Sequence, residues 1–260
     1  MAVAVKLGRK PVVEDARVPY MRTMLAAQPL PPPPPAVNWY AGVQWPMLGN
    51  DQAGDCVEAA IMHAIGSLTS YAGAQVEITT DETLQFYSEV TGYNPLDPST
   101  DEGTVVLGIG GAMEFWVSEG VQIGDDLHYA TGYMQLHLDG SLDAVRQAIH
   151  YFGGLLVGVQ LPASIVAGDT VPYMWSDPSG PVAGGHEIWI CGYEQDAGSY
   201  YYDFVSWGQR YRMSEAFFKA VTVEAVAVYD KDSINARGLN PDGFDVAALV
   251  KAMTAIKAAA

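Results

Sequence analysis

The cysteine at position 56 is the residue whose surroundings best suit nucleophilic chemistry. It ends the polar, glycine-containing string GNDQAGDC and precedes an apolar, helix-forming stretch. A thiol at the start of a helix has its thiolate stabilised by the helix dipole and by unpaired N–H groups. Cys56 is therefore a candidate nucleophile. The alternative interpretation is a small apolar residue that opens a buried helix.

A histidine that could act as the general base lies at position 186, in the string GGHEIWICGYE. Two glycines precede His186 and would leave its ring accessible, and it opens a predicted strand in which Ile188 and Ile190 share its face. Cys191 has the opposite parity, so we expect it to face away as a buried structural thiol. The alternative for His186 is an ordinary histidine at the edge of a strand.

Other kinds of chemistry find little support in the sequence. Neither HExxH nor another paired-histidine spacing occurs, so no metal site is predicted. The string GIGGAMEF has the glycines of a phosphate-binding loop only superficially, because it lacks the third glycine at the right place and a following Lys-Ser/Thr. It is interpreted as a tight entry into a helix.

The elements that must position Cys56 and His186 divide the chain into a helical part and a strand-rich part. Apolar spacings of three and four predict helices over 56–73, 79–92 (with Thr80 or Asp81 as its cap), 110–120 and 141–153 (with Ser141 as its cap). From Gly154 the pattern predicts strands over 155–161, 186–194, 199–208 and 221–230. The predicted fold class is therefore α+β, with helices first and an antiparallel sheet or barrel second.

Segments outside the main domain are expected at both ends. Residues 1–36 form an N-terminal extension that ends in the run Pro31 to Pro35, which must be extended because proline fixes φ. This run is predicted to be a connector laid across the domain surface, docking into a partner's groove being the alternative. The domain itself spans 37–230, and 231–260 form a polar connector and an amphipathic helix.

Composition excludes several classes of protein. The chain has 260 residues, enough for one domain with a large core, and its two cysteines exclude a disulfide scaffold. Thirteen Lys and Arg stand against thirty Asp and Glu, giving a net charge of −17 that argues against nucleic acid as a partner. No apolar run suits a signal peptide or a membrane span, so we expect a soluble protein that is cytoplasmic at synthesis.

The order of these features resembles that of the papain-like cysteine peptidases. Cys56 on a helix and His186 on a strand 130 positions later have the papain-type arrangement, and VNW at 37–39 and SWG at 206–208 add to it. The resemblance covers about 29–228. The strings KLGRKP and WPMLGNDQAGDC especially resemble the divergent papain-like proteins encoded by phages, prophages and some bacteria. The resemblance to this family implies a helical left lobe, a right lobe built on an antiparallel sheet, and a cleft between them.

Two positions depart from the family pattern. The oxyanion-hole Gln of the family stands six positions before the nucleophile, where this chain has Asn50, while Gln52 stands four before; either amide could donate. The family's histidine-orienting Asn precedes SWG, where this chain has Val205. Ser206 is preferred as a substitute orienter, with Asp203 as the alternative.

These residues predict a cysteine hydrolase, and a peptidase in particular, that needs no cofactor. Cys56 would be the nucleophile, His186 the base, and the backbone N–H of Cys56 with Gln52 or Asn50 the oxyanion donors. The partners expected are a peptide or protein substrate, with no membrane and with other phage or virion proteins as a further option. The alternatives are a virion-associated structural or interaction protein with lost catalysis, and a peptidoglycan amidase. The N-terminal extension is shorter than the proregions of papain-like zymogens, so it is not expected to fill the cleft.

Overall fold

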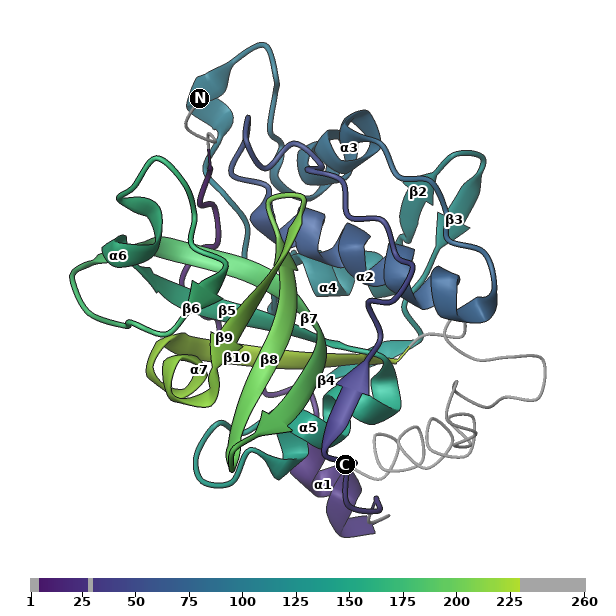
Figure 1. Cartoon of the computed structure of the whole chain (residues 1–260). Helices are drawn as coiled ribbons and strands as arrows, with labels where there is room; N and C mark the ends of the chain where they lie inside the picture. Colours follow the sequence, from purple (N-terminus) through teal and green to yellow (C-terminus); the bar gives the residue numbers. More distant parts are fainter. Residues whose placement is uncertain (1–4, 28–29, 230–260) are drawn as a thin grey trace.

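The computed structural model describes residues 5–27 and 30–229 (Figure 1). Its helices are α1 (Met21–Ala27), α2 (Cys56–Ala72), α3 (Thr80–Thr91), the 3-10 helix η1 (Pro98–Thr100), α4 (Ala112–Ser118), α5 (Asp143–Phe152), α6 (Ala163–Val166) and α7 (Glu215–Val221). Its strands are β1 (Ala36–Asn38), β2 (Val121–Ile123), β3 (Asp126–His128), β4 (Gly132–Gln135), β5 (Leu155–Pro162), β6 (Met174–Trp175), β7 (Val182–Asp196), β8 (Ser199–Ser206), β9 (Gln209–Ser214) and β10 (Thr222–Tyr229). Within these ranges no helix is long and apolar enough to span a membrane.

The predicted helices and strands are present, with differences at their ends. Helix α3 is capped by Thr79 rather than by Thr80 or Asp81, because Thr79 and Glu82 form a reciprocal capping box. Ser141 accepts a hydrogen bond from the Asp143 N–H at 3.2 Å but stands one residue before the N-cap position of α5. Several short elements were not predicted from the sequence: α1, η1, α6, α7, β1, β2, β3, β4, β6 and β9. The predicted C-terminal helix lies outside the described residues.

One long sheet separates two apolar cores. Its strand order is β4-β10-β5-β7-β8-β9-β6, with β1 paired to β7, and all of these pairs are antiparallel except β6 with β9. Along β7, Ile188 and Ile190 lie in one core while Trp189 and Cys191 lie in the other. This alternation is what a strand buried on both faces requires, because successive side chains point to opposite sides.

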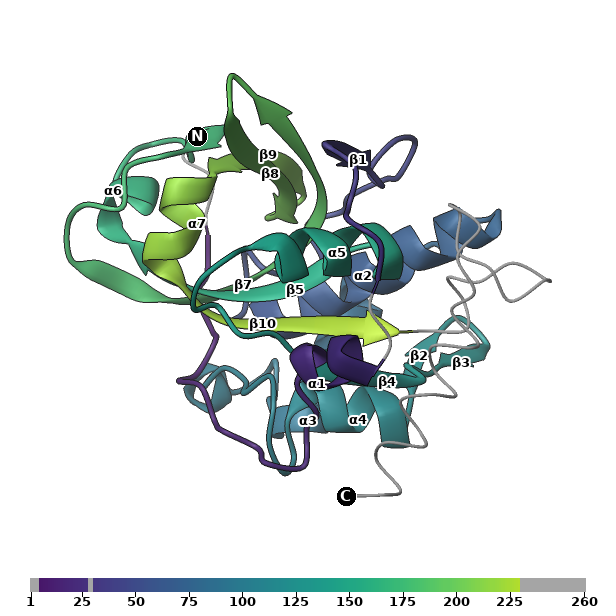
Figure 2. The same ribbon diagram turned by 90° about the horizontal axis from the view of Figure 1, so that it is seen from below.

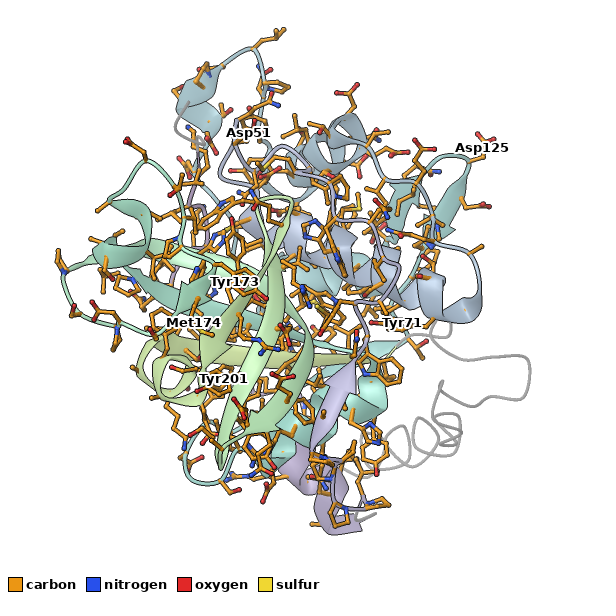
Figure 3. All side chains as sticks on the ribbon, viewed as in Figure 1. Asp51, Tyr71, Asp125, Tyr173, Met174 and Tyr201 are labelled. Carbon is orange, nitrogen blue, oxygen red and sulfur yellow. The ribbon has the colours of Figure 1, made fainter. Side chains whose placement is uncertain are left out.

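Helices cover both faces of the sheet. Figure 2 shows α5 and α7 on one side of β5 and β10, and α3 and α4 on the other. Helix α2, which begins at Cys56, packs against β7. Figure 3 labels Asp51 in the loop before α2 and Tyr71 in its last turn, toward opposite ends of the helix. The α+β architecture expected from the sequence is therefore present.

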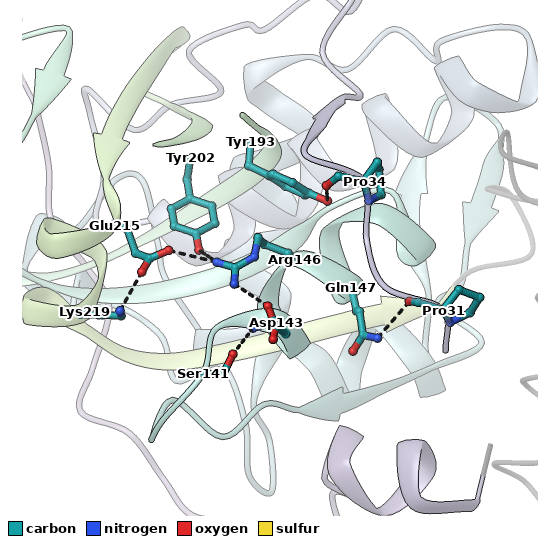
Figure 4. Close-up of polar contacts among 10 residues, drawn as sticks. All are labelled: Pro31, Pro34, Ser141, Asp143, Arg146, Gln147, Tyr193, Tyr202, Glu215 and Lys219. Carbon is teal, nitrogen blue, oxygen red and sulfur yellow. Dashed lines mark hydrogen bonds and ion pairs between the residues drawn. The ribbon is translucent and has the colours of Figure 1, made fainter. Parts of the chain in front are cut away.

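A proline segment, defined here as residues 30–35, lies along α5 and β7. The Pro31 carbonyl accepts a hydrogen bond from Gln147 at 3.1 Å, and the Pro34 carbonyl accepts one from the Tyr193 hydroxyl at 2.9 Å (Figure 4). Residues 36–38 then continue as β1 along the edge of β7. Because prolines cannot donate hydrogen bonds, the segment is fixed through its carbonyl groups.

The same close-up shows a polar cluster that joins α5 to the strands and to α7. Arg146 donates to Asp143 at 2.6 Å, to Glu215 at 3.0 Å and to the Tyr202 hydroxyl at 3.3 Å (Figure 4). Its guanidinium also lies over the ring of Tyr200. Because the arginine fork satisfies three acceptors at once, this cluster fixes α5 on the sheet that carries His186.

Candidate active site

Cys56 is the first residue of α2 and is only 1% exposed. Asp55, at the N-cap position, makes no side-chain cap to the helix, because its carboxylate accepts instead from the Asn50 amide at 3.1 Å. The N–H groups of the first turn are therefore not taken by a side-chain cap. They can stabilise a thiolate on Cys56 or an oxyanion formed next to it.

His186 lies near the start of β7, and its ring is held from two sides. Nε2 is 2.6 Å from the Ser206 hydroxyl oxygen, and the ring stacks on Trp207 with 4.3 Å between centroids. Nδ1 is buried and has no hydrogen-bond partner among the described residues. A ring fixed by Ser206 with its other nitrogen unpaired is suited to accept a proton from a thiol.

The two candidates for the residue that orients His186, Ser206 and Asp203, have different hydrogen-bond partners. Asp203 makes a double contact with the Arg212 guanidinium at 2.9 and 3.1 Å, so its carboxylate is engaged away from the imidazole. Val205 pairs with Trp189 of β7 and is buried in the core that also contains Cys56. Of Ser206 and Asp203, only Ser206 is within hydrogen-bonding distance of His186.

The two predicted oxyanion donors, Asn50 and Gln52, differ in how buried their side chains are. The amide of Asn50 is buried and committed to Asp55. Gln52 is exposed on the turn that precedes the helix. The roles of both residues as oxyanion donors stay predictions.

Burial sets the protonation of both candidate catalytic groups. It raises the pKa of the Cys56 thiol to about 12, although the backbone N–H groups of Gly8 and Glu187 nearby act in the opposite direction. Burial also lowers the pKa of His186 to about 3. Near neutral pH the Cys56 thiol and the His186 imidazole are therefore both neutral in this structure.

The N-terminal extension contributes to this burial, because the backbone N–H of Gly8 lies near the Cys56 thiol. The cleft segment, defined here as residues 5–10, descends from the chain start in Figure 1 (purple) and lies at the junction of α2 and the sheet. The Lys6 N–H donates to the Asn50 carbonyl at 3.0 Å, and the Arg9 N–H donates to the Gly185 carbonyl, next to His186, at 3.2 Å. The expectation that the extension leaves the cleft open was wrong.

Glycines allow the cleft segment to lie this close to the active-site backbone. A Cβ on Gly8 would stand 1.6 Å from the Gly54 carbonyl oxygen, and one on Gly103 would stand 1.9 Å from the Gly8 carbonyl oxygen. A Cβ on Gly185 would stand 2.3 Å from the Arg9 carbonyl oxygen. The glycine before His186, predicted to leave the ring accessible, instead admits the chain's own backbone.

The cleft segment is the functional feature that was not predicted from the sequence. A signal for it exists, because Glu187 and Glu224 are isolated carboxylates within otherwise apolar strands. A buried carboxylate needs a positive partner. The basic string KLGRK near the N-terminus contains that partner, Arg9.

The remaining chemically interesting residues lie elsewhere. His63 is a core histidine, with Nε2 2.9 Å from the Pro46 carbonyl oxygen, and burial lowers its pKa to about 4. It lines a cavity of about 560 Å³ beside Trp45 that includes neither Cys56 nor His186. Cys191 is buried on the face of β7 opposite to Ile188, as its parity predicts.

The fold is similar to those of several solved protein structures. No protein-family model matches the chain, and a search of the curated proteins finds no match. Among solved structures, xylellain, a cysteine protease from Xylella fastidiosa, is 14% identical with a TM-score of 0.66, covering 88% of this chain and 98% of its own. Digestive procathepsin L 3 from Tenebrio molitor is 14% identical with a TM-score of 0.58, covering 88% and 77%. The ragweed pollen allergen Amb a 11 in its proform is 13% identical with a TM-score of 0.61, covering 88% and 69%.

These similarities confirm the papain-like cysteine protease fold that the sequence predicts. At 13–14% identity they bear on the fold, and the assignment of catalytic residues depends on the geometry above. The closer resemblance to phage-encoded proteins stays a prediction.

Proposed function

We propose that this protein is a papain-like cysteine peptidase whose own N-terminal extension covers the active site. The observation that carries the proposal is that the Cys56 thiol, at the uncapped start of α2, lies near the backbone N–H of Glu187, the residue next to His186, whose ring is held by Ser206. The papain-like fold of the chain supports it.

The chemistry needs only groups already present. His186 takes the thiol proton, and the Cys56 thiolate attacks a peptide carbonyl carbon to give a tetrahedral oxyanion next to the first N–H groups of α2. Collapse of that intermediate forms a thioester and releases the amine, which takes the proton from the imidazolium. Water, deprotonated by His186, then attacks the thioester, and the thiolate leaves as the carboxylic acid product forms.

The cleft segment must move before any substrate can bind. Cys56 and His186 are at most 1% exposed beneath it, so a peptide carbonyl cannot reach the thiol. Displacement of residues 5–10 would also remove the burial that keeps both groups neutral. Proteolytic removal of the segment and its displacement by a partner are both compatible with this geometry.

The test uses a full-length variant in which the segment cannot occupy its place. Gly8→Val adds a side chain where Gly54 leaves no room, and turnover is measured on a panel of quenched peptides. We expect Cys56→Ala in this background to abolish turnover while the fold, followed by circular dichroism, is retained. Cys191→Ala is the matched control and should retain turnover. Equal turnover with and without the Cys56 thiol would contradict the proposal.

A non-catalytic interaction protein is the second candidate, favoured by Val205 at the position of the family's orienting Asn and by the filled cleft. It predicts that Gly8→Val exposes Cys56 to iodoacetamide and still cleaves none of the peptides. A peptidoglycan panel run in parallel identifies the amidase alternative by its own products.

A further inference from the structure

The segment that covers the active site is unusually basic for this chain. Three of the thirteen Lys and Arg residues, Lys6, Arg9 and Lys10, lie within five positions of a protein whose net charge is −17. Lys6 lies 3.8 Å from Asp101, and Lys10 lies 3.6 Å from Glu102. Both lysines are well exposed, so these two pairs contribute little. Arg9 is held differently.

The Arg9 side chain is buried between two carboxylates. Nε donates to Glu187 at 2.9 Å and Nη2 donates to Glu224 at 2.6 Å, with the side chains of all three residues between 1% and 4% exposed. Nη1 donates to the Lys10 carbonyl at 3.1 Å. Buried charge-assisted hydrogen bonds of this kind fix both the position and the chemical type of a side chain.

The site that receives Arg9 is built by the sheet. Gly158 of β5 lies in register with Glu187 of β7 on one side and with Glu224 of β10 on the other. A Cβ on Gly158 would stand 2.2 Å from Arg9 Nε, so the missing side chain makes the room for the guanidinium. We call Glu187, Gly158 and Glu224 the Arg9 site. Each Glu keeps one buried oxygen, Oε1, without a hydrogen-bond partner among the described residues.

The Arg9 site adjoins the candidate catalytic residues. Glu187 follows His186 directly, and its backbone N–H lies near the Cys56 thiol. The backbone of the segment is fixed at the same place, because the Arg9 N–H donates to the Gly185 carbonyl. A peptide that places an arginine in this site therefore lies across Cys56 and His186.

We propose that the Arg9 site is a specificity site that selects an arginine side chain in the peptide to be cleaved, and that Arg9 occupies it in the covered enzyme. This inference rests on the proposed function and adds the substrate class, which is a basic peptide. Lysine can reach the same carboxylates but lacks the fork that bonds both at once, so it should be second best.

Neutral side chains should be rejected for a physical reason. An apolar residue in the site would leave two buried carboxyl groups without a donor, and burial already raises the pKa of both. A binding site built to hydrogen-bond a polar group discriminates strongly against analogues that lack it.

The experiment measures this preference in the full chain carrying Gly8→Val and Arg9→Gln, which displaces the segment and removes the competing guanidinium. Quenched peptides carry Arg, Lys, citrulline, Leu or Glu at one position, scanned along an otherwise fixed sequence. Citrulline has nearly the shape of arginine without its charge. At one position we expect kcat/KM for Arg to exceed that for citrulline by at least about tenfold.

Three further variants assign the preference to the Arg9 site. Glu187→Gln or Glu224→Gln should bring the Arg-to-citrulline ratio of kcat/KM close to one. Glu119→Gln, an exposed substitution with the same change of charge, should retain the full ratio. Efficient cleavage of the Leu peptide with no Arg preference would overturn this inference and leave the peptidase assignment intact.

A binding measurement decides the inference if no peptide is cleaved. Cys56→Ala is added to the Gly8→Val/Arg9→Gln chain, and fluorescence anisotropy follows labelled Arg and citrulline peptides. At least tenfold tighter binding of the Arg peptide, lost in Glu187→Gln, supports the Arg9 site even if the proposed function fails. Equal affinity for the two peptides overturns it.

Discussion

Two parts of the N-terminal extension lie against the same domain and are held by different means. The cleft segment is held by a buried guanidinium and by glycines that allow backbone to pack on backbone. The proline segment is held by hydrogen bonds to its carbonyl groups from Gln147, Tyr151 and Tyr193. The first blocks the candidate catalytic pair, whereas the second lies over α5 and β7. The comparison indicates that release of the first segment should change activity, and release of the second only stability.

Displacement of the cleft segment should have the largest effect. Gly8→Val should increase the alkylation rate of Cys56 near pH 8 by about a thousandfold, because a thiol pKa near 12 would fall toward its ordinary value. Iodoacetamide labelling followed by peptide mass spectrometry measures this rate.

The pH profile gives the sign of that effect. The covered thiol is protonated below its raised pKa, so the rate in the unmodified chain should rise steadily from pH 7 to 10, while the variant should level off within that range. Gly168→Val is the matched control, since a Cβ there meets only ordinary contacts. Equal rates of Cys56 labelling in the unmodified chain and in Gly8→Val would contradict the expectation that the cleft segment controls access to the thiol.

Loss of the base should have the next largest effect. In the Gly8→Val chain, His186→Ala should lower turnover by about a hundredfold or more, because His186 is the proposed base that takes the thiol proton. Cys56 alkylation near neutral pH should slow as well. His128→Ala, in the separate two-stranded sheet of β2 and β3, is the control. An alkylation rate indifferent to His186 would mean that the two side chains are not paired.

Loss of the orienting hydroxyl should have a smaller effect. Ser206→Ala in the Gly8→Val chain should lower kcat roughly tenfold, since it removes one hydrogen bond that fixes the His186 ring. Asp203→Ala should lower stability through the lost Arg212 contact while retaining turnover. A rise in turnover for Val205→Asn would instead show that His186 lacks an orienter in the native chain.

Loss of a hydrogen bond to the proline segment should have the smallest effect of these changes. Tyr193→Phe removes the hydrogen bond to the Pro34 carbonyl and should lower the free energy of unfolding by about 1 kcal/mol. Denaturant unfolding measures it, with Tyr173→Phe at an exposed position as the control. Cys56 labelling should stay as slow as in the unmodified chain. Faster labelling would show that the two segments are coupled.

Much of the fold follows from local patterns. The apolar spacing after Cys56 predicts α2, and the alternation along HEIWICGYE predicts β7 with its two faces. The cap of α3 was misplaced by one residue because Thr79, Thr80 and Asp81 are all competent caps, and only the position of Glu82 in the helix selects Thr79. The catalytic roles of Cys56 and His186, which their distinctive local sequences indicate, stay predictions.

Two features could not be fixed from the sequence: the hydrogen bond of Ser206 to His186 and the place of Arg9 in the fold. The choice between Ser206 and Asp203 depended on Arg212, whose distance from either residue no local pattern gives. The hydrogen bond that selects Ser206 forms between β7 and β8, so it depends on the register of those two strands.

The sequence by itself determined the papain-like order of helices and strands and the acidic character of the chain, and it indicated Cys56 and His186 as candidate catalytic residues. These properties are local or additive, so they can be read residue by residue. Only the tertiary structure decided that residues 5–10 cover the site, because that contact joins Gly8 to Gly54 and Gly103, and Arg9 to Gly185, from three distant segments. The Arg9 site likewise exists only where β7, β5 and β10 meet in register, which places two isolated carboxylates on either side of a glycine.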